Sequence, residues 1–208
     1  PISTTPGKQP LPLSVMALAA VLDSPSALRG SRGRAGQGRG TTGAGQVPSA
    51  GSRQAEAWSL VDGNIVADPA AEIIARLSAV PRAGFALLAV SVMPGPQLTQ
   101  AVAVCTRVRA ALPHVPIVWG GYFPTQHADT VLRSPYVDFV IRSQGEQALL
   151  QLVDVLRSGG LPNRVGGLSW KGSGGAGGSG GAVSVVNNPV QPLTKSKSVP
   201  AFGWSMVP

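Results

Sequence analysis

The sequence predicts an α/β fold, with helices on both faces of a doubly wound parallel sheet. Three short apolar runs, at residues 87–90, 117–119 and 139–141, each end in a loop of small or polar residues that leads into a helical pattern. Short links between strands and helices require right-handed crossovers and parallel strands. The carboxyl ends of such strands lie at one edge of the sheet, where folds of this kind bind their ligands.

Composition limits what kind of protein this is. The 208 residues, 43% of them hydrophobic, suffice for one domain with a real core and additional segments. No apolar run is long enough to span a bilayer, so we expect a cytoplasmic protein with no membrane partner. The single cysteine, Cys105, excludes an internal disulfide, a cysteine zinc site and an iron–sulfur cluster within this chain.

The net charge of +8 is concentrated in one segment. Residues 29–53 hold five arginines and no acidic residue, whereas residues 57–170 hold eight basic and seven acidic residues. Residues 23–56 are rich in Gly, Ser, Ala and Arg, and we expect them to form a disordered insertion. Their Arg-Gly dipeptides resemble RNA-binding tails, but the near-neutral remainder favours a solvated linker and argues against a nucleic-acid partner.

The elements of the first half follow in order. Residues 11–22 are apolar nearly all round and predict a buried helix. Residues 58–61 predict a strand, which the turn Asp62-Gly63-Asn64 closes. Asp68 and Pro69 are an N-cap and a first helical residue, and they open the next helix. We assign residues 1–22 and 57–160 to the α/β domain.

The second half continues the alternation. Helices are predicted over residues 97–112, 124–132 and 146–157, and Gly159-Gly160 ends the last of them. Two further strands, at 165–170 and 182–186, predict a small β-hairpin, and a Pro-rich linker then completes residues 161–208. The order 2-1-3-4-5 of a flavodoxin-like or Rossmann-like sheet places its first strand in the middle. Since no strand precedes residue 11, we expect the first strand to be truncated.

The predicted edge offers backbone more than catalytic side chains. Gly95, Gly120, Gly121 and Gly145 would let a bulky ligand approach main-chain amides. His114 lies in a turn between two prolines, and His127 has only a modest claim to touch a ligand. These features suit a large, partly aromatic, amide-rich cofactor and identify no catalytic residue.

The edge also resembles a known family. Ser91-x-Met93, followed after 26 residues by Gly120-Gly121, resembles the SxL…GG signature of cobalamin (B12)-binding domains. The sequence around these motifs most resembles the B12-binding domains that precede radical S-adenosylmethionine (SAM) enzymes. The resembling segments are residues 1–22, 61–64, 118–125, 137–153 and 165–170.

The resemblance implies that cobalamin is the cofactor, with the corrin ring over the edge and its nucleotide tail beside Ser91 and Gly120-Gly121. The residues that it places around cobalamin are Thr4, Thr5, Ser91, Met93, Gly95, Gln97, Gly120, Gly121, Tyr122, Phe123, Pro124, Thr125, Gly145 and Glu146. The first loop, residues 2–7, lacks the histidine that ligates cobalt in classical members, so no protein metal ligand is implied.

The resemblance also implies that cobalamin binding and catalysis belong to different parts of the parent enzyme. The CxxxCxxC motif that holds a [4Fe–4S] cluster is absent, so SAM and the cluster are expected only in a downstream radical SAM domain, which would be the partner of this chain. The chain alone would bind cobalamin without catalysing a reaction, and the parent enzyme would be a methyltransferase or a cyclase. The alternative is a non-enzymatic flavodoxin-like interaction module.

Overall fold

The computed structural model describes residues 58–81, 84–172, 184–190 and 192. The predicted helix at 11–22, the insertion at 23–56 and most of the linker after residue 192 lie outside the described residues. Thr4 and Thr5 lie outside them as well.

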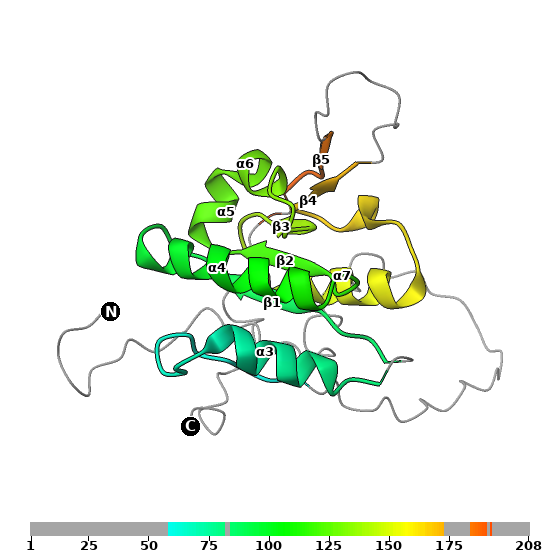
Figure 1. Cartoon of the computed structure of the whole chain (residues 1–208). Helices are drawn as coiled ribbons and strands as arrows, with labels where there is room; N and C mark the ends of the chain where they lie inside the picture. Colours follow the sequence, from blue (N-terminus) through cyan, green and yellow to red (C-terminus); the bar gives the residue numbers. More distant parts are fainter. Residues whose placement is uncertain (1–57, 82–83, 173–183, 191, 193–208) are drawn as a thin grey trace, which may run out of the picture.

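A five-stranded sheet forms the centre of the described molecule (Figure 1). Its strands, in spatial order, are β1 (Leu88–Ser91), β2 (Ile117–Gly120), β3 (Phe139–Ile141), β4 (Leu168–Lys171) and β5 (Val185–Asn187). The first three strands are parallel, whereas β4 and β5 are antiparallel to their neighbours. The predicted hairpin is confirmed, and it continues the sheet because β4 pairs with β3.

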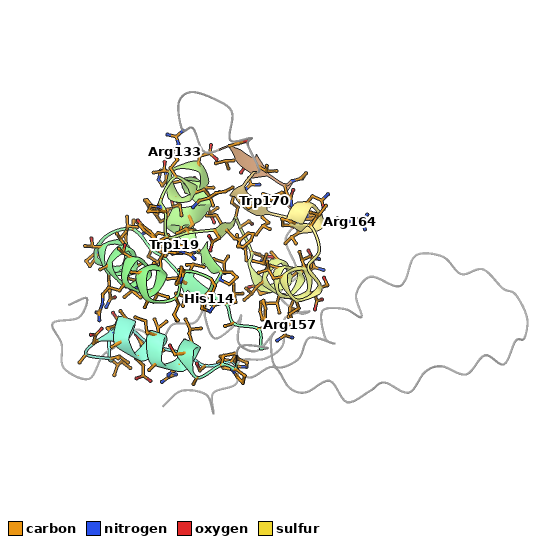
Figure 2. All side chains as sticks on the ribbon, turned by 45° about the vertical axis from the view of Figure 1, so that its right-hand side comes forward. His114, Trp119, Arg133, Arg157, Arg164 and Trp170 are labelled. Carbon is orange, nitrogen blue, oxygen red and sulfur yellow. The ribbon has the colours of Figure 1, made fainter. Side chains whose placement is uncertain are left out.

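Helices cover both faces of this sheet. They are α3 (Pro69–Ser78), α4 (Pro96–Ala111), α5 (Tyr122–Gln126), α6 (Ala128–Leu132), α7 (Glu146–Ser158) and the short 3-10 helix η2 (Pro162–Arg164). Figure 2 shows α4 and α7 on opposite sides of the strands, with α3 lying next to α4. The predicted fold class, an α/β sheet wound on both faces, is confirmed.

Two apolar cores separate the layers. Trp119 and Leu132 belong to the core beneath α3 to α6, whereas Val118 and Leu152 belong to the core beneath α7. Neighbouring residues of β2 thus point to opposite faces, as successive strand residues do. Residues 117–119 are all buried, so β2 is the doubly covered central strand that its continuous apolar run predicts.

The predicted helix ends are also found. The Asp68 carboxylate accepts a hydrogen bond from the backbone N–H of Ala71 (3.1 Å), and Pro69 is the first residue of α3. At the other end of the domain, Gly159 ends α7 in the left-handed region, at φ 64°.

Two predicted elements differ from the structure. Residues 58–61 form no strand. Among the described residues the sheet begins at β1, and the Leu60 carbonyl accepts a hydrogen bond from the Arg76 guanidinium (3.1 Å). The helix predicted at 124–132 is two helices, since His127 has φ −128° and ψ 38° and interrupts the helical backbone. The first of them begins at Tyr122 and accommodates Pro124 in its first turn, where a missing N–H costs no helical hydrogen bond.

Candidate cofactor-binding edge

The site is built on the paired ends of β1 and β2. Ser91 and Gly120 are register partners at the last position of the ladder, and the Val92 N–H then donates to the Gly120 carbonyl (2.8 Å). Within the described part of the chain, the atom nearest to a Cβ added at Gly120 would be the Ile141 carbonyl oxygen, at 3.9 Å. The backbone at Gly120 is therefore open to a ligand that approaches the edge.

Gly121 has a different role from its neighbour. Its φ of +100° lies in a region that side chains disfavour, and a Cβ there would sit 2.9 Å from the Val92 carbonyl oxygen and 3.0 Å from its nitrogen. The Phe123 N–H donates to that same carbonyl (3.2 Å). Gly121 is thus needed so that the loops after β1 and β2 can pack together.

The loop between β1 and α4 supplies a second open backbone position and an apolar surface. Gly95 has φ +96°, and no atom of the described residues lies within 4 Å of the position of its missing Cβ. Met93 is 47% exposed, and Tyr122, which begins the neighbouring loop, is 60% exposed. Gln97 is half-buried in the first turn of α4. Exposed flat or flexible apolar side chains at the edge suit a broad ligand with an apolar face.

The third loop, between β3 and α7, is joined to the second by Thr125. Its hydroxyl donates to the Gly121 carbonyl (2.7 Å) and accepts from the Ser143 N–H (3.1 Å). Ser143 has φ 68°, the left-handed conformation that non-glycine residues rarely adopt. Gly145 follows as the N-cap of α7, and the Oε2 atom of Glu146 is buried with no hydrogen-bond partner among the described residues.

The sequence-predicted residues that are described gather at this edge, on the three loops that follow β1, β2 and β3. Pro124 differs from them because it is buried, so it packs within the fold. His127 is exposed and its ring lies 4.8 Å from that of Phe123. His114 is exposed in the turn between α4 and β2, at the opposite end of the strands.

Two residues of the edge were missed by sequence reasoning. Val92, the middle residue of Ser91-x-Met93, is fully buried and bonds to the second loop through both its N–H and its carbonyl. Ser143 carries the strained backbone of the third loop. No residue-type signal could have found either of them, because their roles depend on backbone geometry.

Among the described residues, no group of three or more His, Cys, Asp or Glu side chains could ligate a metal ion. Within the same part of the chain, no helix is long and apolar enough to cross a membrane.

Comparison with known families shows to which protein family the chain belongs. The model of the B12-binding domain family matches residues 50–153, which is half of the chain and contains β1, β2, β3 and their loops. The chain belongs to the B12-binding domain family.

Relatives of this B12-binding domain are parts of much longer proteins. The anaerobic magnesium-protoporphyrin IX monomethyl ester cyclase of Synechocystis sp. is 28% identical over 101 residues, which are 48% of this chain and 18% of the cyclase.

A solved structure shows the same fold. The cobalamin-dependent SAM radical enzyme OxsB, solved with aqua-cobalamin and SAM, matches with a TM-score of 0.53 and 18% identity, covering 66% of this chain and 18% of OxsB. The radical SAM methyltransferase TsrM from Kitasatospora setae, solved with cobalamin and a [4Fe–4S] cluster, gives 0.45 and 17% identity over 66% of this chain and 23% of TsrM. This chain therefore spans about a fifth of the length of these relatives, and its fold is similar to that of a part of the cobalamin-dependent SAM radical enzyme OxsB.

Proposed function

We propose that this chain binds cobalamin on behalf of a radical SAM enzyme of the methyltransferase or cyclase type. SAM and the [4Fe–4S] cluster would be held by a separate radical SAM domain of the parent protein, which would also contribute the catalytic residues. One observation carries the proposal. The residues that match the family model include the carboxyl edge of the sheet, where Ser91 and Gly120 end adjacent parallel strands. The name of the Synechocystis relative supports the cyclase alternative.

The residues present fit this cofactor. The open backbone positions at Gly95 and Gly120 allow a bulky group to approach main-chain atoms. The exposed side chains of Met93 and Tyr122 offer an apolar surface to the corrin face. The unpartnered Oε2 atom of Glu146 is an acceptor for an amide N–H at the corrin periphery, and such a contact would satisfy a buried polar atom.

The chain's own residues would bind and orient the cofactor. When bound, cobalamin supplies a cobalt centre that can carry and transfer an alkyl group. Ser91, half-buried at the end of β1, would hydrogen-bond the nucleotide tail, and Met93 with Tyr122 would exclude water from the corrin face. The chain contains two histidines, and neither is well placed as a cobalt ligand, since His114 is at the far end of the strands and the His127 ring lies against Phe123.

The test is retention of cobalamin by the purified chain. We expect hydroxocobalamin or methylcobalamin to remain bound after desalting, with visible corrinoid absorbance at near-equal molar ratio. A Gly120→Val variant, whose fold is checked by far-UV circular dichroism, should lose at least about tenfold in affinity through occlusion of the open backbone.

A matched glycine at the opposite end of α7 provides the control. An added Cβ at Gly160 would lie 3.3 Å from the Ser158 hydroxyl and 3.6 Å from the Val155 carbonyl oxygen, so it fits without a severe clash, and Gly160→Ala should bind as the unaltered chain does. If the folded chain retains no cobalamin, the proposal is wrong and the interaction-module alternative is favoured. Equal affinities of Gly120→Val and Gly160→Ala would contradict the assignment of the edge.

A further inference from the structure

A continuous series of hydrogen bonds crosses the carboxyl edge and links its three loops. The loop after β1 is joined to the end of β2 by Val92, whose N–H donates to the Gly120 carbonyl (2.8 Å) and whose carbonyl accepts from Phe123 (3.2 Å). The loop after β2 is joined to the loop after β3 by Thr125. The first link uses backbone atoms, whereas the second depends on a side chain and can therefore be removed by a single substitution.

The Thr125 hydroxyl is fully engaged by the protein as a donor. Its one hydrogen is directed to the Gly121 carbonyl at 2.7 Å, and that carbonyl also receives the Thr125 backbone N–H at 3.2 Å. One lone pair of the same oxygen accepts the Ser143 N–H at 3.1 Å. A hydroxyl in this state has no hydrogen left to donate to a ligand.

The residue that Thr125 holds is conformationally strained. Ser143 has φ 68°, and a residue with a Cβ remains in this conformation only where its surroundings impose it. The hydrogen bond from its N–H to Thr125 is one such restraint. Two residues later Gly145 caps α7, and Glu146 follows with its buried unpartnered oxygen. The direction of this whole segment therefore depends on the conformation of Ser143.

We propose that Thr125 is a positioning residue, which holds the loop after β3 in its strained conformation and so sets the orientation of Gly145 and Glu146 toward cobalamin. It acts through Ser143 and does not contact the cofactor. The role in cobalamin binding rests on the proposed function, whereas the restraint on Ser143 does not.

Three variants separate the hydroxyl from the shape of the side chain. Thr125→Val keeps the shape and removes both hydrogen bonds, whereas Thr125→Ser keeps the hydroxyl. Thr106→Val is the matched control, because the Thr106 hydroxyl also donates to the carbonyl four residues earlier in its helix (Val102, 2.8 Å) but lies on the exposed side of α4. A Thr125→Ala variant provides a second hydroxyl deletion if Thr125→Val does not fold.

The first measurement is amide hydrogen exchange in the cofactor-free protein. Exchange of the Ser143 amide should accelerate at least about tenfold in Thr125→Val, since its acceptor is lost, and should be unchanged in Thr125→Ser and Thr106→Val. Unchanged exchange at Ser143 in folded Thr125→Val or Thr125→Ala would overturn the proposal, whether or not the chain binds cobalamin.

The second measurement is cobalamin affinity. We expect about a tenfold loss in Thr125→Val, near-complete rescue in Thr125→Ser, and partial recovery in the double variant Thr125→Val/Ser143→Gly, because glycine adopts φ 68° without a restraint. If Ser143 exchanges faster but affinity is unaltered, the positioning role is wrong. If the unaltered chain binds no cobalamin, the proposed function fails, and the exchange experiment still decides the restraint.

Discussion

Three glycines at the carboxyl edge should respond differently to the same substitution. Gly121 combines a positive φ with close backbone neighbours, Gly95 has a positive φ in open space, and Gly120 has neither feature. Replacing each by alanine adds one methyl group at nearly the same place in the fold. The series therefore separates backbone strain from steric overlap.

The expected magnitudes follow from the geometry. At Gly121, φ 100° and ψ −169° fall in a region populated almost only by glycine, where another residue costs on the order of 1–3 kcal/mol. The added Cβ would lie 2.9 Å from the Val92 oxygen, and because this is backbone it cannot rotate away, so overlap adds about 1–3 kcal/mol. We expect a loss of about 2–6 kcal/mol for Gly121→Ala, about 1–3 kcal/mol for Gly95→Ala and less than about 1 kcal/mol for Gly120→Ala.

Urea unfolding of the cofactor-free chain measures these differences. Far-UV circular dichroism and tryptophan fluorescence, to which the buried Trp119 contributes, provide two probes of the same transition. For a domain of this size, each kcal/mol corresponds to a few degrees in Tm, so Gly121→Ala should melt about 10 °C or more below the unaltered chain. Equal stabilities of Gly121→Ala and Gly120→Ala would refute the packing of the loops after β1 and β2 described above.

Three further predictions concern residues away from the edge. Burial raises the pKa of the Cys105 thiol to about 11, so this thiol should react with thiol reagents only after unfolding. Between pH 9 and pH 11 only the unfolded thiol ionises, so the free energy of unfolding should fall by about 2–3 kcal/mol over this range. In Cys105→Ala this fall should be absent. The Arg107 guanidinium and the Ala71 N–H lower the pKa of Asp68, so its stabilising effect should be present at neutral pH and be lost as the pH falls below 3.8. Asp68→Asn keeps the helix cap, so it should have a higher urea midpoint than Asp68→Ala in both low and high salt. Leu152→Ala should cost about 2–5 kcal/mol in urea unfolding, because its fully buried side chain fills the core beneath α7, and a loss below about 1 kcal/mol would contradict that packing.

Much of the fold could be predicted because the apolar runs and helix-end residues in the sequence correspond to elements that the structure contains. Continuous apolar runs located β1, β2 and β3 within a few residues of their observed bounds, and Asp68-Pro69 and Gly159 marked helix ends. The prediction failed at residues 58–61, where an apolar run has strand propensity but no neighbouring strand in the sheet. Strand propensity becomes a strand only when a partner supplies the ladder hydrogen bonds.

The candidate site, too, could be predicted only in part. Glycines after buried strands predicted where a ligand could approach, but the pattern Gly120-Gly121 could not reveal that one glycine is open and the other is packed against Val92. Thr125 was predicted to contact the cofactor, and we now propose that it acts through Ser143. Whether the predicted set touches cobalamin stays a prediction.

The sequence by itself determined the class of the fold and the edge at which we propose that the cofactor binds, because apolar periodicity, caps and glycines act over a few neighbouring residues. Only the tertiary structure decided which groups at that edge are already engaged. The Val92 carbonyl, the Gly121 Cα and the Thr125 hydroxyl meet atoms that lie far away along the chain, from loops after different strands. Contacts of that kind depend on how the strands are paired and on the conformation of each loop, which no single stretch of residues specifies.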